Sequence, residues 1–320
     1  MGHTSSHEAV RQHVHFSWRD LLLAGSLAIL LYVVVPQFAT FRHSLSLLRS
    51  ASWLLLSLAV FLEIATFFVA AFVLWVLAVK PVRYSRSLIV QGASGFTNRL
   101  LPAGLGGMGI KAAFLHRSRH TTVQATGVAI MNNALGFVGH FVLLAIVLIV
   151  YPASQFHIGA TSKMWALRAA IAVVVLAVMA TIIYASKLFV SARRKLAALG
   201  HTFKSYSTRI PALLAGLLGS VGITVCNMAI FFVCAHALGS RLSIADVVII
   251  STVGMAAAAV TPTPGGLGGV EAGLVAGMVG FGSTDDVALA AVLLYRLLTY
   301  WLPIVPGLLL FHISLRRKYV

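Results

Sequence analysis

The apolar part of this sequence is interrupted by two matching turns, Pro-Ala-Gly-Leu-Gly-Gly at residues 102–107 and Pro-Gly-Gly-Leu-Gly-Gly at residues 264–269. Proline ends a helix because it lacks a backbone N–H, and glycine accepts backbone angles that other residues avoid. Each turn lies inside an apolar region, 88–116 or 244–281. We therefore predict that each region is a helix, a turn and a second helix that enter and leave a membrane on one side.

The composition is typical of a membrane protein with many spans. Hydrophobic residues make up 59% of the 320 residues and charged residues 10%, and the mean hydropathy is +0.95. The apolar runs are long rather than alternating, which favours helices over a β-barrel. The sequence thus predicts an all-α polytopic membrane protein in which two broken, re-entrant helical hairpins accompany six full spans, at 20–38, 52–79, 122–150, 165–185, 210–238 and 287–312.

Positive charge dominates, with 24 Lys and Arg against 7 Asp and Glu. Most of these cations fall in short loops beside the spans, sixteen on one side of the membrane and five on the other. Because loops rich in Lys and Arg stay on the cytoplasmic side, both termini are predicted to be cytoplasmic, in a multi-pass protein of the cytoplasmic (inner) membrane. Cations in these loops lie where they would face anionic lipid headgroups. The positive charge is thus explained by the membrane, and nucleic acid is not expected as a partner.

The two broken regions occupy equivalent places in two halves of the chain. Full spans flank each region, which delimits a first repeat at 52–150 and a second at 210–312. One extra span between the two repeats makes the second repeat cross the membrane in the opposite direction to the first. We therefore predict an inverted-topology repeat. Both repeats belong to one transmembrane domain of residues 20–315, with short tails at 1–19 and 316–320. Paired interruptions of this kind mark the binding site in many transporters.

Five ionisable side chains lie within apolar stretches, and intramembrane charges usually face a bundle interior or a pathway. They are Glu63, Arg99, Lys111, Glu271 and Arg296. The helices expected to begin near Met108 and Val270 direct unpaired N–H groups and positive dipole ends at the membrane centre, which attracts an anion.

We therefore expect an anionic group, such as a lipid headgroup phosphate, to bind at the turns with Arg99, Lys111 and Arg296 neutralising it. The candidate site comprises Arg99, Pro102, Gly104, Gly106, Gly107, Lys111, Pro264, Gly265, Gly266, Gly268, Gly269, Glu271 and Arg296.

Other interpretations of these residues remain open at this stage. Glycines also let membrane helices pack closely without any ligand. Glu271 is expected to cap a helix, to pair with Arg296 or to couple protons. Glu63 is expected to pair with Lys111 or Arg99, or to carry protons.

No nucleotide-binding, metalloprotease or serine-hydrolase motif occurs. We therefore expect neither a cofactor nor a metal, and we expect the chain not to be an enzyme. Cys226 and Cys234 are about 12 Å apart by helical rise, which is too far for a disulfide.

Three motifs resemble a known family. Residues 261–272 (TPTPGGLGGVEA) look like the Pro-Gly-Gly-x-Gly-x-x-Glu signature of the lysylphosphatidylglycerol synthase transmembrane-region family, the flippase-like domain of the multiple peptide resistance factor. Residues 99–111, with Arg99 and Lys111 around the first turn, are similar to its first motif. Residues 295–303 (YRLLTYWLP) resemble its closing motif. The resemblance extends over residues 20–315.

The resemblance implies movement of an anionic or modified lipid between leaflets, for example an aminoacylated, polyprenyl-linked or glycosylated lipid. The synthases carry a soluble aminoacyl-transfer domain after this region, so a chain ending at Val320 is expected to be a stand-alone relative. A membrane phospholipid or lipid-linked substrate is the expected partner, and a partner enzyme or a homo-oligomer stays open. The alternatives are a non-transporting lipid-binding partner of an envelope-modifying enzyme, and an intramembrane transferase with Glu271 or Glu63 as its base.

Overall fold

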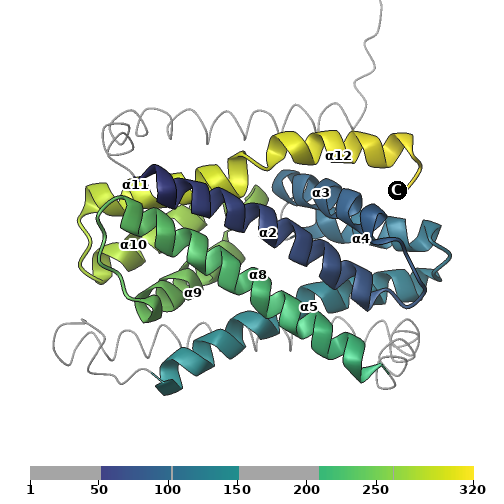
Figure 1. The fold of residues 1–320 in the computed structure, drawn as a ribbon, viewed down its shortest axis with the longest axis horizontal. Helices are drawn as coiled ribbons and strands as arrows, with labels where there is room; N and C mark the ends of the chain where they lie inside the picture. Colours follow the sequence, from purple (N-terminus) through teal and green to yellow (C-terminus); the bar gives the residue numbers. More distant parts are fainter. Residues whose placement is uncertain (1–51, 102–103, 151–208, 262) are drawn as a thin grey trace, which may run out of the picture. The chain divides into compact units, whose positions relative to one another are not determined.

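The computed structural model describes residues 52–101, 104–150, 209–261 and 263–320, and within these ranges every regular element is a helix. This agrees with the predicted all-α class. The expected spans at 20–38 and 165–185 lie outside the described residues. The elements, labelled in Figure 1, are α2 (Trp53–Leu77), α3 (Tyr84–Leu100), α4 (Leu105–Arg117), α5 (Thr122–Val150), α8 (Ile210–Ala237), α9 (Ile244–Val260), η3 (Pro264–Gly266), α10 (Gly269–Gly280), α11 (Asp285–Arg296), η4 (Leu297–Trp301) and α12 (Ile304–Arg316).

Four helical stretches of the described chain are long and apolar enough to cross a membrane. They are Trp53–Leu77, Thr122–Val147, Ile210–Ala237 and Asp285–Arg316, the last of which joins α11, η4 and α12. Their bounds match the expected spans 52–79, 122–150, 210–238 and 287–312 to within a few residues. The chain is therefore a multi-pass membrane protein.

Both remaining apolar regions are divided into two helices at the Gly-rich turns. The second helix of the first region begins at Leu105, three residues before the expected start at Met108, because Gly104 already supplies the left-handed turn with φ 69°. Gly106 and Gly107 do not use the unusual backbone angles that glycine permits, because both lie in the first turn of α4 with ordinary φ.

Gly107 is needed for close packing instead. Its N–H donates to Asn98 Oδ1 at 2.6 Å, so the start of α4 is attached to the end of α3, and a Cβ at this position would overlap the Asn98 side chain. A Cβ at Gly269, at the start of α10, would likewise overlap the Thr261 side chain. The close-packing interpretation of these glycines is thus realised in both turns.

The outer loops of the two helix pairs, α3–α4 and α9–α10, lie at opposite ends of the described bundle. Lys80 Nζ donates to the carbonyl of Arg119, which joins the loop before α3 to the loop after α4. Ser240 and Ser283 bring their hydroxyls within 3.3 Å, which joins the loop before α9 to the loop after α10. Since α8 begins beside the end of α2 and ends where α9 begins, these two loop pairs lie at opposite ends of α8.

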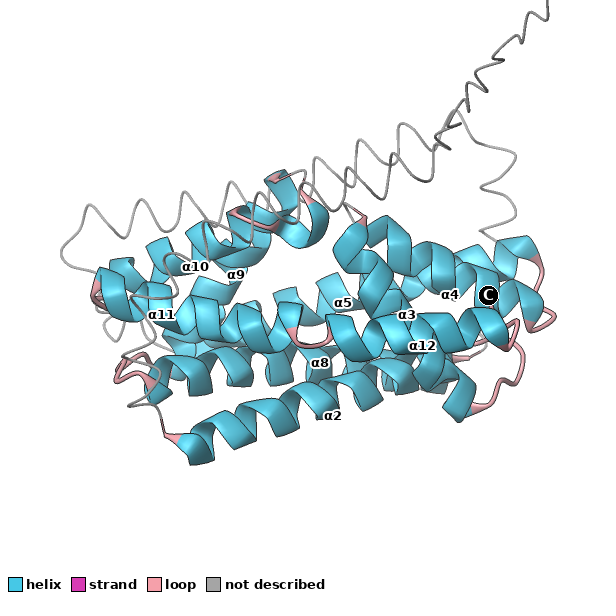
Figure 2. Cartoon of the chain, turned by 90° about the horizontal axis from the view of Figure 1, so that it is seen from above, coloured by secondary structure: helices cyan, strands magenta, loops and turns pink. Residues whose placement is uncertain are grey.

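The buried apolar side chains of the described residues form two clusters. One gathers side chains of α2, α3, α4 and α5 around Phe114, and the other gathers side chains mainly of α8, α9, α10 and α11 around Phe231. Helices α2 and α8 pack along each other, as do α3 and α12 (Figure 2). Each broken helix pair is therefore packed against at least one long span.

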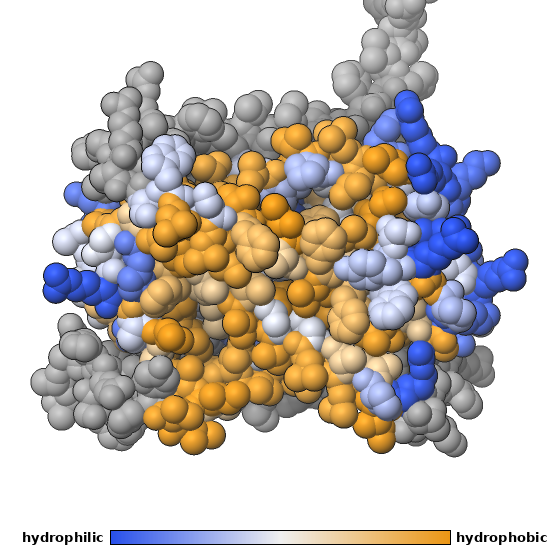
Figure 3. Space-filling model, in the orientation of Figure 1, coloured by the Kyte–Doolittle hydropathy of each residue, from blue (hydrophilic) through white to orange (hydrophobic). Residues whose placement is uncertain are grey.

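Charged residues gather at the helix ends. Arg117 Nη1 donates to the carbonyl of Lys318 at 3.3 Å, and the Arg86 guanidinium carbon lies 5.4 Å from the centre of the Tyr319 ring. Asp285 begins α11 at the other end. Figure 3 shows an apolar surface between two hydrophilic ends, which is the distribution that a membrane requires.

Candidate functional site

The span at Asp285–Arg316 is not a uniform helix, although the sequence predicts a full span without a break at 287–312. Pro303 has no N–H to offer the carbonyl of Thr299, four residues earlier. Leu302 N–H instead donates to Leu297 O at 2.8 Å, which widens this turn into a π-helix. Such widened turns are frequent at functional sites.

Arg99 satisfies the carbonyl that Pro303 leaves free. Its Nη2 donates to Thr299 O at 2.7 Å, and its Nη1 donates to Gly95 O, in its own helix, at 2.7 Å. Arg99 Nε is buried and has no partner among the described residues. The guanidinium therefore joins the end of α3 to the widened turn and leaves its Nε–H without an acceptor among the described residues.

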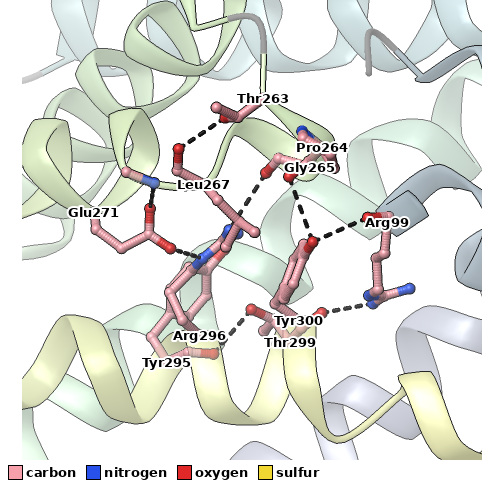
Figure 4. Close-up of polar contacts among 11 residues, drawn as sticks. Arg99, Thr263, Pro264, Gly265, Leu267, Glu271, Tyr295, Arg296, Thr299 and Tyr300 are labelled. Atoms are coloured by element: carbon pink, nitrogen blue, oxygen red, sulfur yellow. Dashed lines mark hydrogen bonds and ion pairs between the residues drawn. The ribbon is translucent and has the colours of Figure 1, made fainter. Parts of the chain in front are cut away.

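Tyr300 connects the ends of both broken segments (Figure 4). Its hydroxyl lies 3.1 Å from Arg99 O, at the end of α3, and 3.4 Å from Pro264 O, in the second turn. One O–H cannot fully satisfy two acceptors at once. The Tyr300 ring also lies against Gly265, whose φ of 62° and lack of a Cβ allow this approach. A single side chain of the last span thus reaches both breaks.

Two guanidinium groups flank the Tyr300 ring. The Cζ atom of Arg296 is 4.4 Å from the ring centre, and that of Arg99 is 5.7 Å away. Cations at these distances are attracted to the negative face of an aromatic ring. The Tyr300 ring therefore lies between the buried guanidinium of Arg296 and the half-buried guanidinium of Arg99.

Glu271 and Arg296 form a buried ion pair, with exposed fractions of 8% and 7%. Arg296 Nε lies 2.6 Å from Glu271 Oε1, and Arg296 Nη2 donates to Gly265 O at 3.3 Å. Glu271 Oε2 accepts the N–H of Gly268 at 2.7 Å, at the start of α10. The carboxylate therefore serves both as the cap and as the partner of Arg296, two of the three roles that the sequence left open.

Glu63, on α2, is the second carboxyl group of this region. It is close enough to Arg99 for an electrostatic attraction, although the two side chains form no ion pair within the described structure. Glu63, Arg99, Glu271 and Arg296 therefore bring two carboxyl groups and two guanidinium groups into one region. We call these four residues and Tyr300 the central cluster.

Lys111 does not belong to the central cluster. It is buried on α4, where its Nζ donates to Asn132 Oδ1 of α5 at 2.6 Å. No carboxylate pairs with it in the part of the chain that the structure describes. Of the three cations expected at one site, Arg99 and Arg296 lie together at Tyr300, whereas Lys111 lies apart from them beside Asn132.

The turn residues are divided in the same way. Pro264 and Gly265 contact the central cluster through their carbonyls, whereas Gly106 and Gly107 pack on α3 and Gly269 packs on α9. Gly266 and Gly268 take positive φ. Pro102 lies outside the described residues.

Tyr300 and Thr299 were predicted only as members of the closing motif at residues 295–303, with no individual role. Pro303, in the middle of an apolar span, was the available signal for the free Thr299 carbonyl. No group of three or more His, Cys, Asp or Glu side chains that could hold a metal ion occurs within the described ranges.

Comparison with known proteins gives one family. A family model described as the lysylphosphatidylglycerol synthase TM region matches residues 21–307. A search of curated proteins gives no match.

Proposed function

Because the chain belongs to the lysylphosphatidylglycerol synthase transmembrane-region family, we propose that it moves a lipid with a phosphate-bearing headgroup between the leaflets of the cytoplasmic membrane. Membership and the four candidate spans establish a membrane protein of a lipid-related family. Movement between leaflets, and the identity of the lipid, are the parts that we propose.

The observation that carries this proposal is the position of Tyr300. Its hydroxyl lies between carbonyls of two broken segments that open at opposite ends of the bundle. If the two halves form the predicted re-entrant, inverted repeat, alternating access follows, in which one half rocks against the other around a central site. Exchange of the hydroxyl between Arg99 O and Pro264 O would uncouple one segment at a time.

Arg99 is the group best placed to bind phosphate. Its buried Nε has no acceptor within the described residues, whereas Arg296 is already neutralised by Glu271. A phosphate oxygen is a strong acceptor for a guanidinium N–H. The headgroup would therefore bind first at Arg99 and compete with Glu271 for Arg296.

The basic helix ends support the proposed orientation. Arg86, Arg117 and Lys318 lie at the same end as the opening of α3–α4. Lys and Arg are retained on the cytoplasmic side. In this orientation α3–α4 opens towards the cytoplasm, α9–α10 opens towards the outside, and the C-terminus is cytoplasmic.

Transport in proteoliposomes tests the function. We expect Arg99→Ala to slow the movement of a labelled anionic phospholipid at least about tenfold, the equivalent of one hydrogen bond to a charged group. Arg241→Ala, at an exposed position outside the central cluster, is the matched control and should keep the wild-type rate. Equal rates for wild type and Arg99→Ala, both folded, would remove the support for a translocase.

The Glu271–Arg296 pair also favours a second candidate. Because these two groups satisfy each other, the central cluster is also compatible with a fixed lipid-binding protein that serves an envelope-modifying enzyme. That function predicts lipid that co-purifies with the chain, stable association with another protein, and no transfer between leaflets in the same proteoliposomes.

A further inference from the structure

One face of α3 is polar throughout its length. Ser87, Gln91, Ser94 and Asn98 recur at intervals of four, three and four residues, so they lie on one side of the helix. Ser87 is 0% exposed and Ser94 is 1% exposed. The Oγ atoms of both serines and Oε1 of Gln91 are buried without a hydrogen-bond partner among the described residues. We call this face the α3 polar stripe.

Several hydroxyl groups elsewhere in these helices behave differently, although Ser220 Oγ of α8 is also buried without a partner among the described residues. Thr66 donates to the carbonyl four residues earlier at 2.9 Å, and Thr97, beside the stripe on α3 itself, does so at 3.1 Å. This local bond is the usual solution for a hydroxyl in an apolar helix. Ser87 and Ser94 do not use it, so their donors are left for another acceptor.

The stripe faces the side of α3 on which Lys111 lies. Gly107 N–H binds Asn98 Oδ1, and α3 and α4 run antiparallel from that contact. One helical turn further along each helix brings Lys111 to the level of Ser94. Lys111 is a buried cation whose only described polar contact is the amide of Asn132.

A closely packed, dry interface does not account for these groups. Buried polar atoms without partners and buried charges without counter-charges are both unfavourable, and more so inside a membrane. Such atoms in proteins are usually satisfied by internal water or by a ligand. A positive charge next to several hydroxyl and amide groups is suited to a hydrated anion.

We propose that the α3 polar stripe, together with Lys111 and Asn132, is a hydrated track along which a phosphate-bearing headgroup passes between the basic end of α3 and Arg99. Water fills the track when no headgroup is present. That a lipid headgroup is the group that passes rests on the proposed function. The hydration of the track and its preference for anions do not depend on that function.

Thiol accessibility in the full chain in proteoliposomes tests the track. The two native cysteines are first removed as Cys226→Ala and Cys234→Ala, and Ser94→Cys is then introduced. The matched control is Ala93→Cys, which is also 0% exposed but lies away from the stripe on the same helix. Two small water-soluble methanethiosulfonates of similar size are compared, one with a negative sulfonate and one with a positive trimethylammonium group.

We expect Ser94→Cys to react at least about tenfold faster than Ala93→Cys, and to react faster with the negative reagent, because a buried cation concentrates anions locally. Adding Lys111→Met should remove the preference for the negative reagent and leave the reaction with the positive one. Ser87→Cys, nearer the end of α3, gives the same comparison if Ser94→Cys does not fold.

Equal reactivity of the stripe cysteines and Ala93→Cys would overturn the track, as would an absence of charge preference that Lys111→Met leaves unchanged. These outcomes are separate from the transport result. Lipid movement with unreactive stripe cysteines overturns the track and leaves the proposed function in place. Reactive, anion-selective cysteines without lipid movement support the hydrated track and count against the translocase.

Discussion

Glu271 combines two roles that are usually filled by different residues. One carboxylate oxygen binds Arg296 Nε at 2.6 Å and the other accepts Gly268 N–H at 2.7 Å. Because both oxygens are occupied, proton coupling by Glu271 would require at least one of these bonds to break. The same contacts make the residue a sensitive point for stability.

We expect Glu271→Gln to lower the free energy of unfolding by about 3 kcal/mol, since it leaves the Arg296 charge buried and unpaired. The double variant Glu271→Gln with Arg296→Met should recover much of that loss, because both charges are removed together. Thermal unfolding in detergent, arranged as a double-mutant cycle, measures the coupling. Asp285→Asn, at the exposed start of α11, is the control, and additive effects in the cycle would contradict the ion-pair interpretation.

His120 lies in the loop between α4 and α5, outside the spans. It accepts Lys80 N–H at its Nε2 at 3.0 Å, and its Nδ1 lies 3.0 Å from Leu115 O. Only the neutral ring, with its proton on Nδ1, satisfies both contacts. Burial lowers the pKa of His120 below its ordinary value of 6.5, and the nearby cations Lys80 and Arg209 lower it further.

The lowered pKa of His120 makes the stability of the fold depend on pH. Between the lowered folded pKa and 6.5 the unfolded chain binds more protons at His120, so stability rises with pH in this window. The contribution is fully present above 6.5 and is lost as the pH falls towards the folded pKa. We expect the melting temperature of wild type to fall more steeply than that of His120→Gln between pH 7 and pH 5. Parallel curves for the two proteins would contradict this role of His120.

At the scale of the element, the widened turn at Leu297–Trp301 is the feature that creates the central cluster. Its cause is local, because Pro303 cannot donate to Thr299 O. Its consequence is long-range, because the freed carbonyl binds Arg99, 200 residues away in the sequence. The same span then presents Tyr300 to both broken segments.

Pro303→Ala should therefore affect function more than stability. The restored N–H competes with Arg99 for the Thr299 carbonyl, while removal of a proline from a helix interior is itself stabilising by up to about 3 kcal/mol. We expect an unchanged or higher melting temperature together with slower lipid movement. Pro306→Ala, at an exposed position in α12, is the matched control, and equal transport by the two variants would show that the widened turn is dispensable.

At the scale of the whole molecule, the two halves of the described chain meet in several places, and two of these contacts differ in kind. The long helices α2 and α8 pack along each other, and the broken segments meet through Tyr300. The first contact buries apolar side chains over many turns, whereas the second depends on a few polar contacts. Rearrangement between the halves is therefore expected to occur at Tyr300 and to leave the packing of α2 on α8 intact.

Much of the fold could be predicted from the sequence. The bounds of α2, α5 and α8, and the division of both apolar regions, follow from hydropathy and from proline and glycine positions. The roles of individual glycines were harder to predict. Gly104 turns the chain and Gly107 allows close packing, and only the neighbouring Asn98 distinguishes the two.

The sequence by itself determined where helices run and break, because those properties depend on residues within a few turns of each other. It also identified which charges lie in apolar stretches. Only the tertiary structure decided which of these charges meet, because that depends on side-chain directions in helices distant along the chain. It placed Glu271 on Arg296, put Tyr300 between two guanidinium groups, and separated Lys111 from both of those guanidinium groups, next to Asn132.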